Sequence, residues 1–280
     1  MKMGRWSVVA IGVVAQITSL PACAADLAPA PSYAKAPLVA PAYSWTGFYV
    51  GGNFGGAWGK SDYNFLPTAG PLTGGWDAQN VAQLSSDGAT RLGMNNVSGG
   101  GQAGYNWQID QLLFGLEADI QYVGLRKTNT FTQNGIIPGL NTPYVFTENS
   151  QSDWLATVRG RIGFTVDRVL FYGTGGLAIA DSRSSDTLAF PTLAPAATFT
   201  GIGSRSNTQP GWTAGGGVEW AFAPNWSVKG EYLFAQFGGS TTAMTAINTT
   251  FLQSYSDRLS LSVARVGVNY HFGGPVVAKF

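Results

Sequence analysis

The segment that decides the fold is WLATVRGRIGF, residues 154–164, in which apolar and polar side chains alternate between an aromatic residue at each end. Two further segments share this design and length, FYVGGNFGGAW at 48–58 and WTAGGGVEWAF at 212–222. In a β-strand, residues an even number of positions apart lie on one face. Ten steps of about 3.3 Å, tilted by roughly 40°, rise about 25 Å, the height of the apolar band on a transmembrane β-barrel. Aromatic residues at both edges of such a band form its girdles, so the pattern predicts a membrane barrel.

The composition agrees with strands rather than helices in a membrane. Only 11% of the 280 residues are charged, whereas soluble domains average about 25%. The sequence has no apolar run of 18 residues, the length that a spanning helix needs. Its 38 glycines and 13% aromatic residues suit a barrel, and a net charge of +1 gives no indication of nucleic-acid binding.

The N-terminus has the pattern of a secretory signal peptide, residues 1–24. Lys2 and Arg5 precede a mostly apolar stretch at 8–17, and ACA at 22–24 is a small-residue cleavage site. Cys23 also stands in LPAC, which weakly resembles a lipoprotein box, so lipidation is the alternative. Residues 25–44 contain four prolines among alanines and predict a periplasmic linker, followed by the barrel at 45–280.

Eight alternating segments predict an all-β, antiparallel, up-and-down transmembrane barrel. We expect the strands at 46–59, 99–109, 112–123, 153–164, 169–180, 211–222, 226–236 and 258–272. In the last segment the apolar phase changes near Val263, which indicates either a bulge or a strand that starts beyond the membrane.

The connections alternate in length, as they do in outer-membrane barrels. Short turns are expected at 110–111, 167–168 and 223–225, and long extracellular loops at 60–98, 125–152, 181–210 and 238–257. Across the turns, pairing Ile109 with Leu112 places Trp107 opposite Phe114. Pairing Phe222 with Trp226 places Glu219 opposite Lys229.

Two sets of residues are the candidate functional positions. The aromatic girdles are expected to comprise Phe48, Trp58, Trp107, Phe114, Tyr122, Trp154, Phe164, Phe171, Trp212, Phe222, Trp226, Phe234, Tyr270 and Phe272. A network of balanced charges is expected inside the lumen, comprising Glu117, Asp119, Arg159, Arg161, Glu219, Lys229, Glu231 and Arg265. A soluble barrel with its apolar face inside is the structural alternative, but girdle placement and sparse charge count against it.

The network bears on function. Eight strands leave an interior only wide enough for side chains. Paired charges that fill it would block diffusion, which predicts a closed, structural barrel. A narrow porin for small solutes is the alternative, because such a network could rearrange.

Other chemistry is weakly supported by the sequence. His271 is the sole histidine, and Ser-His catalysis would need a nucleophile and an orienting acid within reach. No His/Cys cluster suggests a metal, and the glycine triplets at 99–101 and 215–217 lack the Lys-Ser/Thr of a P-loop. We therefore expect neither an enzyme, a metal site nor a cofactor.

Several segments resemble the alphaproteobacterial porin-like outer-membrane β-barrel family, which includes major surface antigens of Brucella, Bartonella and Rhizobium relatives. They are WTGFYVGG at 45–52, GGGQAGYNW at 99–107, WLATVRGRIG at 154–163, LFYGTGGLA at 170–178, WSVKGEYL at 226–233 and VGVNYHF at 266–272.

The resemblance implies an eight-stranded barrel of the Gram-negative outer membrane, inserted by the β-barrel assembly machinery. It implies an assembly signal in terminal aromatics, for which Tyr270 with Phe272 and the C-terminal Phe280 are the candidates. It also implies a role in envelope integrity and surface interaction, contact with outer-membrane lipid and lipopolysaccharide, and host or phage ligands at the loops. Some members are credited with haemin binding, but the expected loops offer Tyr63, Met94, Tyr144, Met244 and Tyr255 without a histidine.

Overall fold

The computed structural model describes residues 43–67, 78–134, 143–191, 200–246 and 253–272, all within the compact unit 41–280. The predicted signal peptide, nearly all of the linker and Phe280 lie outside these residues. Within the described ranges, no helix is long and apolar enough to cross a membrane. The elements are β1 (Gly47–Pro67), α1 (Ala78–Asp87), β2 (Thr90–Ile109), β3 (Leu112–Asn134), β4 (Pro143–Val166), β5 (Val169–Ala189), β6 (Thr200–Ala223), β7 (Trp226–Phe237), β8 (Ser240–Ala246) and β9 (Gln253–His271).

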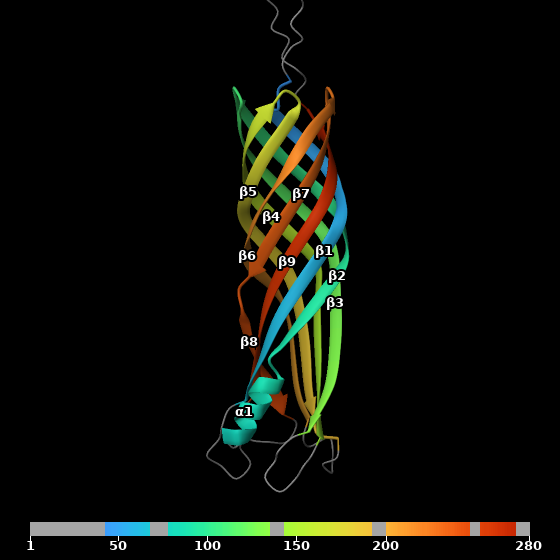
Figure 1. Cartoon of the computed structure of the whole chain (residues 1–280), viewed down its shortest axis with the longest axis vertical. Coiled ribbons are helices and arrows are strands. Elements are labelled where there is room, and N and C mark those ends of the chain that lie inside the picture. The colour runs from blue at the N-terminus through green and yellow to red at the C-terminus, as the bar shows by residue number, and fades with distance from the viewer. Residues whose placement is uncertain (1–42, 68–77, 135–142, 192–199, 247–252, 273–280) are drawn as a thin grey trace, which may run out of the picture. The chain divides into compact units, whose positions relative to one another are not determined.

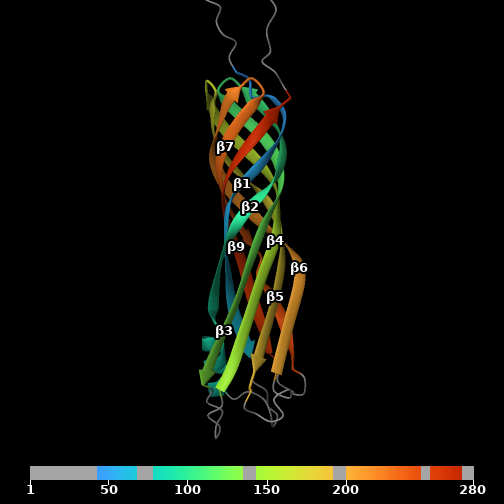
Figure 2. The same ribbon diagram turned by 90° about the vertical axis from the view of Figure 1, so that its right-hand side faces the viewer.

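The strands form one antiparallel sheet that closes on itself (Figures 1 and 2). Each strand pairs with the next along the chain, except that β7 pairs with β9 and not with β8, and β1 closes the ring by pairing with β9 from Tyr49↔His271 to Pro67↔Gln253. Short turns join β2 to β3, β4 to β5 and β6 to β7 at one end, here called the turn end. α1 lies at the other end, here called the loop end (Figure 1).

β8 continues the line of β7 after a break at Gly238 and Gly239. Gln236 of β7 pairs with Ser260 of β9, and Ser240 of β8 pairs with Asp257, so one residue is gained across the break. β6 pairs with β7 as far as Gly211 and with β8 only at 201–202. The nine strands therefore make an eight-stranded barrel whose seventh strand is interrupted.

The predicted loops are wrong in extent, because every strand except β7, which ends at Phe237, continues beyond its predicted bound toward the loop end. β4 begins at Pro143 instead of 153, and β6 begins at Thr200 instead of 211. In these extensions Tyr144, Phe146 and Leu188 are buried inside the barrel. The hydrophobic side thus changes from the outer face to the inner face, which allows the strands to continue outside the membrane while they bury a second apolar core.

The same inversion explains the phase change in the last strand. Leu259, Leu261 and Val263 are buried, as is Arg265 further along the same face. The pairing of β9 with β1 is continuous through this region, so no bulge interrupts it. The strand starts beyond the membrane band, and its apolar residues enter the lumen.

The expected turn registers are largely confirmed. Ile109 pairs with Leu112 and Trp107 with Phe114, and Glu219 pairs with Lys229. The third turn is shifted, because Trp226 pairs with Ala223 rather than with Phe222.

Candidate functional site: the lumen of the barrel

The eight charged residues predicted for the lumen all point inward in the half of the barrel nearer the turn end. Glu117 and Asp119 come from β3, Arg159 and Arg161 from β4, Glu219 from β6, Lys229 and Glu231 from β7, and Arg265 from β9. All eight side chains are completely shielded from solvent, with an exposed fraction of 0%. They alternate along their strands with the outward apolar residues, so strand geometry alone directs them to a common interior.

Glu117 is the centre of this group. Its Oε1 accepts from Arg159 Nη2 at 2.5 Å, and its Oε2 accepts from Lys229 Nζ at 2.8 Å. Arg161 Nη1 lies 3.4 Å from Oε2, and the Tyr49 hydroxyl donates to the same oxygen at 2.7 Å. One carboxylate is thereby held by strands on several sides of the ring.

The remaining members complete a continuous network. Arg265 donates to Asp119 at 3.0 Å and to Glu231 at 2.6 Å. Arg159 donates to Asp119 at 2.7 Å and to Glu231 at 3.0 Å. Four cations thus meet four carboxylates, which offsets the large cost of burying unpaired charges.

Cross-strand neighbours in the network are not always ion-pair partners. Glu219 and Lys229 are cross-strand neighbours, but Glu219 accepts from Arg161 Nη2 at 2.8 Å. The Lys229 ammonium turns toward Glu117 and lies 3.7 Å from Glu231 Oε2. Long side chains in a narrow lumen reach across it more readily than along its wall, so adjacency in the sheet does not decide the partner.

Apolar layers lie on both sides of the network. Toward the turn end, buried Trp45, Leu113, Leu170 and Ala221 pack with Tyr172. Toward the loop end, a larger layer includes Leu125, Leu155, Leu233, Phe237 and Leu261. The sequence analysis did not predict this second layer. The change in apolar phase at 259–263 is the feature of the sequence that could have revealed it.

His271 lies beside the network but not in a catalytic arrangement. Its Nε2 is 2.9 Å from the Ser227 hydroxyl oxygen and 3.5 Å from Glu219 Oε1. Both partners approach the same ring nitrogen, whereas a catalytic triad uses the two nitrogens separately. Ser227 is fully buried and also donates to Glu219 at 2.5 Å, so its oxygen has no path to a substrate.

The predicted girdle residues all lie on the outer face of the barrel. Trp58, Tyr122 and Trp212 are about half exposed near the loop-end edge of the apolar band, and Phe164, Phe171 and Phe222 near its turn-end edge. Tyr270 and Phe272 are exposed at the turn end, the latter by 61%. Neighbouring girdle rings touch, as in the edge-on contact of Trp226 with Tyr270 at 5.1 Å between centroids.

A second set of inward carboxylates, which the sequence did not single out, lies in the loop-end half. Glu148, Asp186 and Asp257 are 3–4% exposed, and Glu148 stands directly opposite Asp186. Burial, reinforced by the charges of Glu148 and Asp257, raises the pKa of Asp186 to about 8. Burial likewise raises the pKa of Glu148 and of Asp257. Among the described residues, no group of three or more His, Cys, Asp or Glu side chains is arranged to hold a metal ion.

The tyrosines and methionines expected in exposed loops lie elsewhere. Tyr63, Met94, Tyr144, Met244 and Tyr255 are all buried in the barrel, with exposures of 6% or less. Their side chains pack in apolar clusters, so they do not form an open face for a flat ligand such as haem.

Comparison with known proteins agrees with this architecture. The model of the outer membrane protein beta-barrel domain matches residues 20–272. The 31 kDa outer-membrane immunogenic protein of Brucella melitensis is 32% identical over 94% of this chain and 99% of its own length. The 22 kDa outer membrane protein of Rhizobium leguminosarum is 30% identical over 71% of this chain and 67% of its own. The 25 kDa outer-membrane immunogenic protein of Brucella abortus is 25% identical over 84% of this chain and 82% of its own. The chain therefore belongs to the outer membrane protein β-barrel family and resides in the Gram-negative outer membrane.

Proposed function

We propose that the protein is a structural, non-catalytic barrel of the outer membrane, whose lumen is plugged by its own side chains. The observation that carries the proposal is the ion-pair network, in which all eight charged side chains are excluded from solvent. A path for water or solutes along the barrel axis would expose at least some of these groups.

The layers around the network support the same function. A solute that enters from the loop end meets the apolar layer of Leu125, Leu155 and Phe237 before it reaches the charges. A solute from the turn end meets Trp45 and Tyr172. Ions are repelled by apolar layers because they lose hydration there, and neutral solutes find no space between paired charges.

Single-channel recording of the refolded mature protein in a planar bilayer tests the proposal. We expect a silent wild type, and intermittent openings in Glu219→Gln or Arg161→Gln, since each breaks the 2.8 Å ion pair of these two residues, unbalances the buried charges and loosens the plug. Arg168→Gln on a turn outside the lumen is the control and should stay silent. Steady, solute-permeable openings of the wild type would replace this proposal with the narrow porin.

We further propose that the loop end meets the surroundings of the cell. Outer-membrane barrels place short turns in the periplasm and long connections outside, and the Brucella relatives are named as immunogenic. Antibodies raised against the folded protein should label intact cells and lose that labelling after proteolysis of whole cells. Labelling only after permeabilisation would contradict this orientation.

A further inference from the structure

The outward charges just beyond the loop-end girdle are unevenly distributed. Five basic residues face outward on the described strands of this region, namely Lys60, Arg91, Arg126, Arg183 and Arg258. Two acidic residues, Asp62 and Asp153, share that outer surface, and the buried Asp181 lies 3.6 Å from Arg183, which leaves a surplus of two positive charges. At the opposite rim, the described turns at 110–111 and 167–168 carry Asp110, Asp167 and Arg168, with no basic surplus.

Asp153, one of the outward acidic residues, fixes the positions of two arginines on this surface. Asp153 of β4 accepts from Arg126 Nη2 of β3 at 3.0 Å and from Arg183 Nη1 of β5 at 2.9 Å. Its own backbone is fixed, because the N–H groups of Asp153 and Trp154 both donate to Asp181 Oδ1, at 2.7 and 2.8 Å. One carboxylate on the middle strand thus orients a guanidinium on each neighbouring strand.

Most of the donors on these two arginines remain free for another partner. A guanidinium has five N–H donors in a planar fork, and Asp153 engages one nitrogen of each side chain. Asp181 Oδ2 also lies 3.6 Å from Arg183 Nη2, a longer contact. The side chains of Arg126 and Arg183 are 60% and 50% exposed. Paired guanidiniums held at fixed positions are suited to the planar, bidentate recognition of phosphate or carboxylate.

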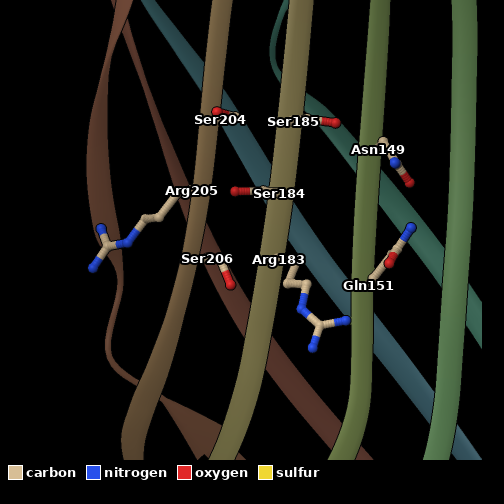
Figure 3. A pocket seen from close by; sticks show the side chains of 8 residues that line it. All are labelled: Asn149, Gln151, Arg183, Ser184, Ser185, Ser204, Arg205 and Ser206. Atoms are coloured by element: carbon tan, nitrogen blue, oxygen red, sulfur yellow. The ribbon is translucent and has the colours of Figure 1, made fainter.

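A polar pocket of about 270 Å³ adjoins Arg183 on the outer wall (Figure 3). Register places its outward lining in two rows, Gln151, Arg183 and Ser206 in one, and Asn149, Ser185 and Ser204 in the other. Arg126 extends the first row, since it pairs with Gln151. The pocket therefore offers amide and hydroxyl groups beside the guanidiniums, and none of the residues that line it is acidic.

The height of this site on the barrel identifies its partner. Trp154 of the girdle follows Asp153 in sequence, and Trp212 lies nearer the turn end of β6 than Ser206 does. The site therefore stands immediately beyond the apolar band on the outer side, at the level of lipid headgroups. The lipid of that leaflet is lipopolysaccharide, which carries anionic groups on a sugar backbone, and basic residues near a membrane surface attract such charges.

We propose that Arg126, Arg183 and the adjoining pocket bind an anionic headgroup of outer-leaflet lipopolysaccharide. The guanidiniums contact the charged group, and Gln151, Ser204 and Ser206 bond the neighbouring sugar hydroxyls. The site depends on the location of the protein in the outer membrane and not on whether its lumen conducts, so the bilayer recordings above do not test it.

The test compares thermal unfolding of the refolded full mature chain in phosphatidylcholine vesicles with and without purified rough-form lipopolysaccharide. We expect lipopolysaccharide to raise the unfolding midpoint of the wild type. The double variant Arg126→Gln with Arg183→Gln should lose most of that rise and at least about tenfold in apparent affinity, since it removes both charge-assisted contacts to the anion. The control Arg168→Gln changes one exposed charge at the periplasmic rim and should keep the full rise.

Further arms distinguish the sources of the anion. Vesicles with phosphatidylglycerol, or inorganic phosphate alone, should protect the wild type much less than lipopolysaccharide does. Equal protection by either would overturn the assignment to lipopolysaccharide, and an undiminished rise in the double variant would overturn the site. Should that variant fail to refold, Asp153→Asn keeps both arginines but frees them, and it should weaken the lipopolysaccharide effect; an unchanged effect there would equally refute the site.

Discussion

Lys229 on β7 lies 2.8 Å from Glu117 on β3, although these strands stand on opposite sides of the ring. The contact therefore spans the full width of the lumen. Arg159 on β4 reaches the same carboxylate from a third position. Ion pairs across the lumen thus connect opposite walls of the barrel, and each charge depends on partners from distant parts of the chain.

The network should make Arg159 indispensable for stability. Arg159→Ala removes the shared partner of Glu117, Asp119 and Glu231 and leaves buried carboxylates undercompensated. Breaking one partner of a buried ion pair costs about 3–5 kcal/mol. Urea unfolding in lipid vesicles measures the loss. Arg183→Ala, which breaks only exposed pairs, is the matched control and should cost under about 1 kcal/mol. Equal effects of the two variants would argue against a buried network.

The apolar layer beyond the network should be sensitive to cavities. Phe237 is 2% exposed at the end of β7, whereas Phe234 on the same strand faces outward. Phe237→Ala should destabilise the barrel by about 3–5 kcal/mol, because the interior collapses poorly around a lost ring. Phe234→Ala should cost less, since lipid fills the vacated space. A smaller effect at Phe237 than at Phe234 in the same unfolding assay would contradict the packed layer.

Gly124 occupies a backbone conformation that an L-amino acid side chain disfavours. Its φ is +50°, and it lies in the irregularity where β3 shifts register against β4 between Tyr122 and Leu125. Gly124→Ala should lower stability by at least about 1–2 kcal/mol. Gly93→Ala, in open space on β2, provides the comparison and should be neutral or slightly stabilising. A neutral result at Gly124 would mean that the register shift has another cause.

The loop-end carboxylates predict a pH dependence. The pKa of Asp186 is about 8 in the folded barrel, against about 3.9 in an unfolded chain. Because its pKa is raised, folded Asp186 keeps a proton that the unfolded chain loses above about pH 4. The stabilisation of the fold by this proton is therefore full below pH 4 and is lost as the pH rises toward 8. We expect the free energy of unfolding to fall over that window by up to about 5–6 kcal/mol from this group, at about 1.4 kcal/mol per pKa unit. Asp186→Asn should reduce the fall in the free energy of unfolding between pH 4 and 8, measured by unfolding at a series of pH values. An unchanged pH dependence would exclude Asp186 as its source.

The membrane part of the barrel could be read from the sequence because a single rule governs it. Residues such as Phe48 and Trp58 face lipid, and polar residues alternate with them, so strand, face and turn register all follow from one pattern. The inward direction of Glu117 and Arg159 follows from the same alternation.

Beyond the loop-end girdle the apolar side chains face inward instead of outward, and here the prediction of loops from the sequence was wrong. Tyr144 and Phe146 are buried inside, while Thr128 and Thr130 face water on β3, so the segments look too polar for lipid and resemble loops. The partners of Lys229 were equally out of reach. Cross-strand register is local, whereas a contact across the lumen depends on the diameter and curvature of the closed ring.

The pairing of β1 with β9 means that the first and last strands to leave the ribosome are neighbours in the finished wall. Residues as far apart as Lys60 and Ser260 must meet before the ring is complete. Until then two strand edges carry unpaired N–H and C=O groups, each of which costs several kcal/mol in hydrocarbon. A chain that lacks β9 is therefore not a smaller barrel but an open sheet, whose two free edges the hydrocarbon of the bilayer disfavours.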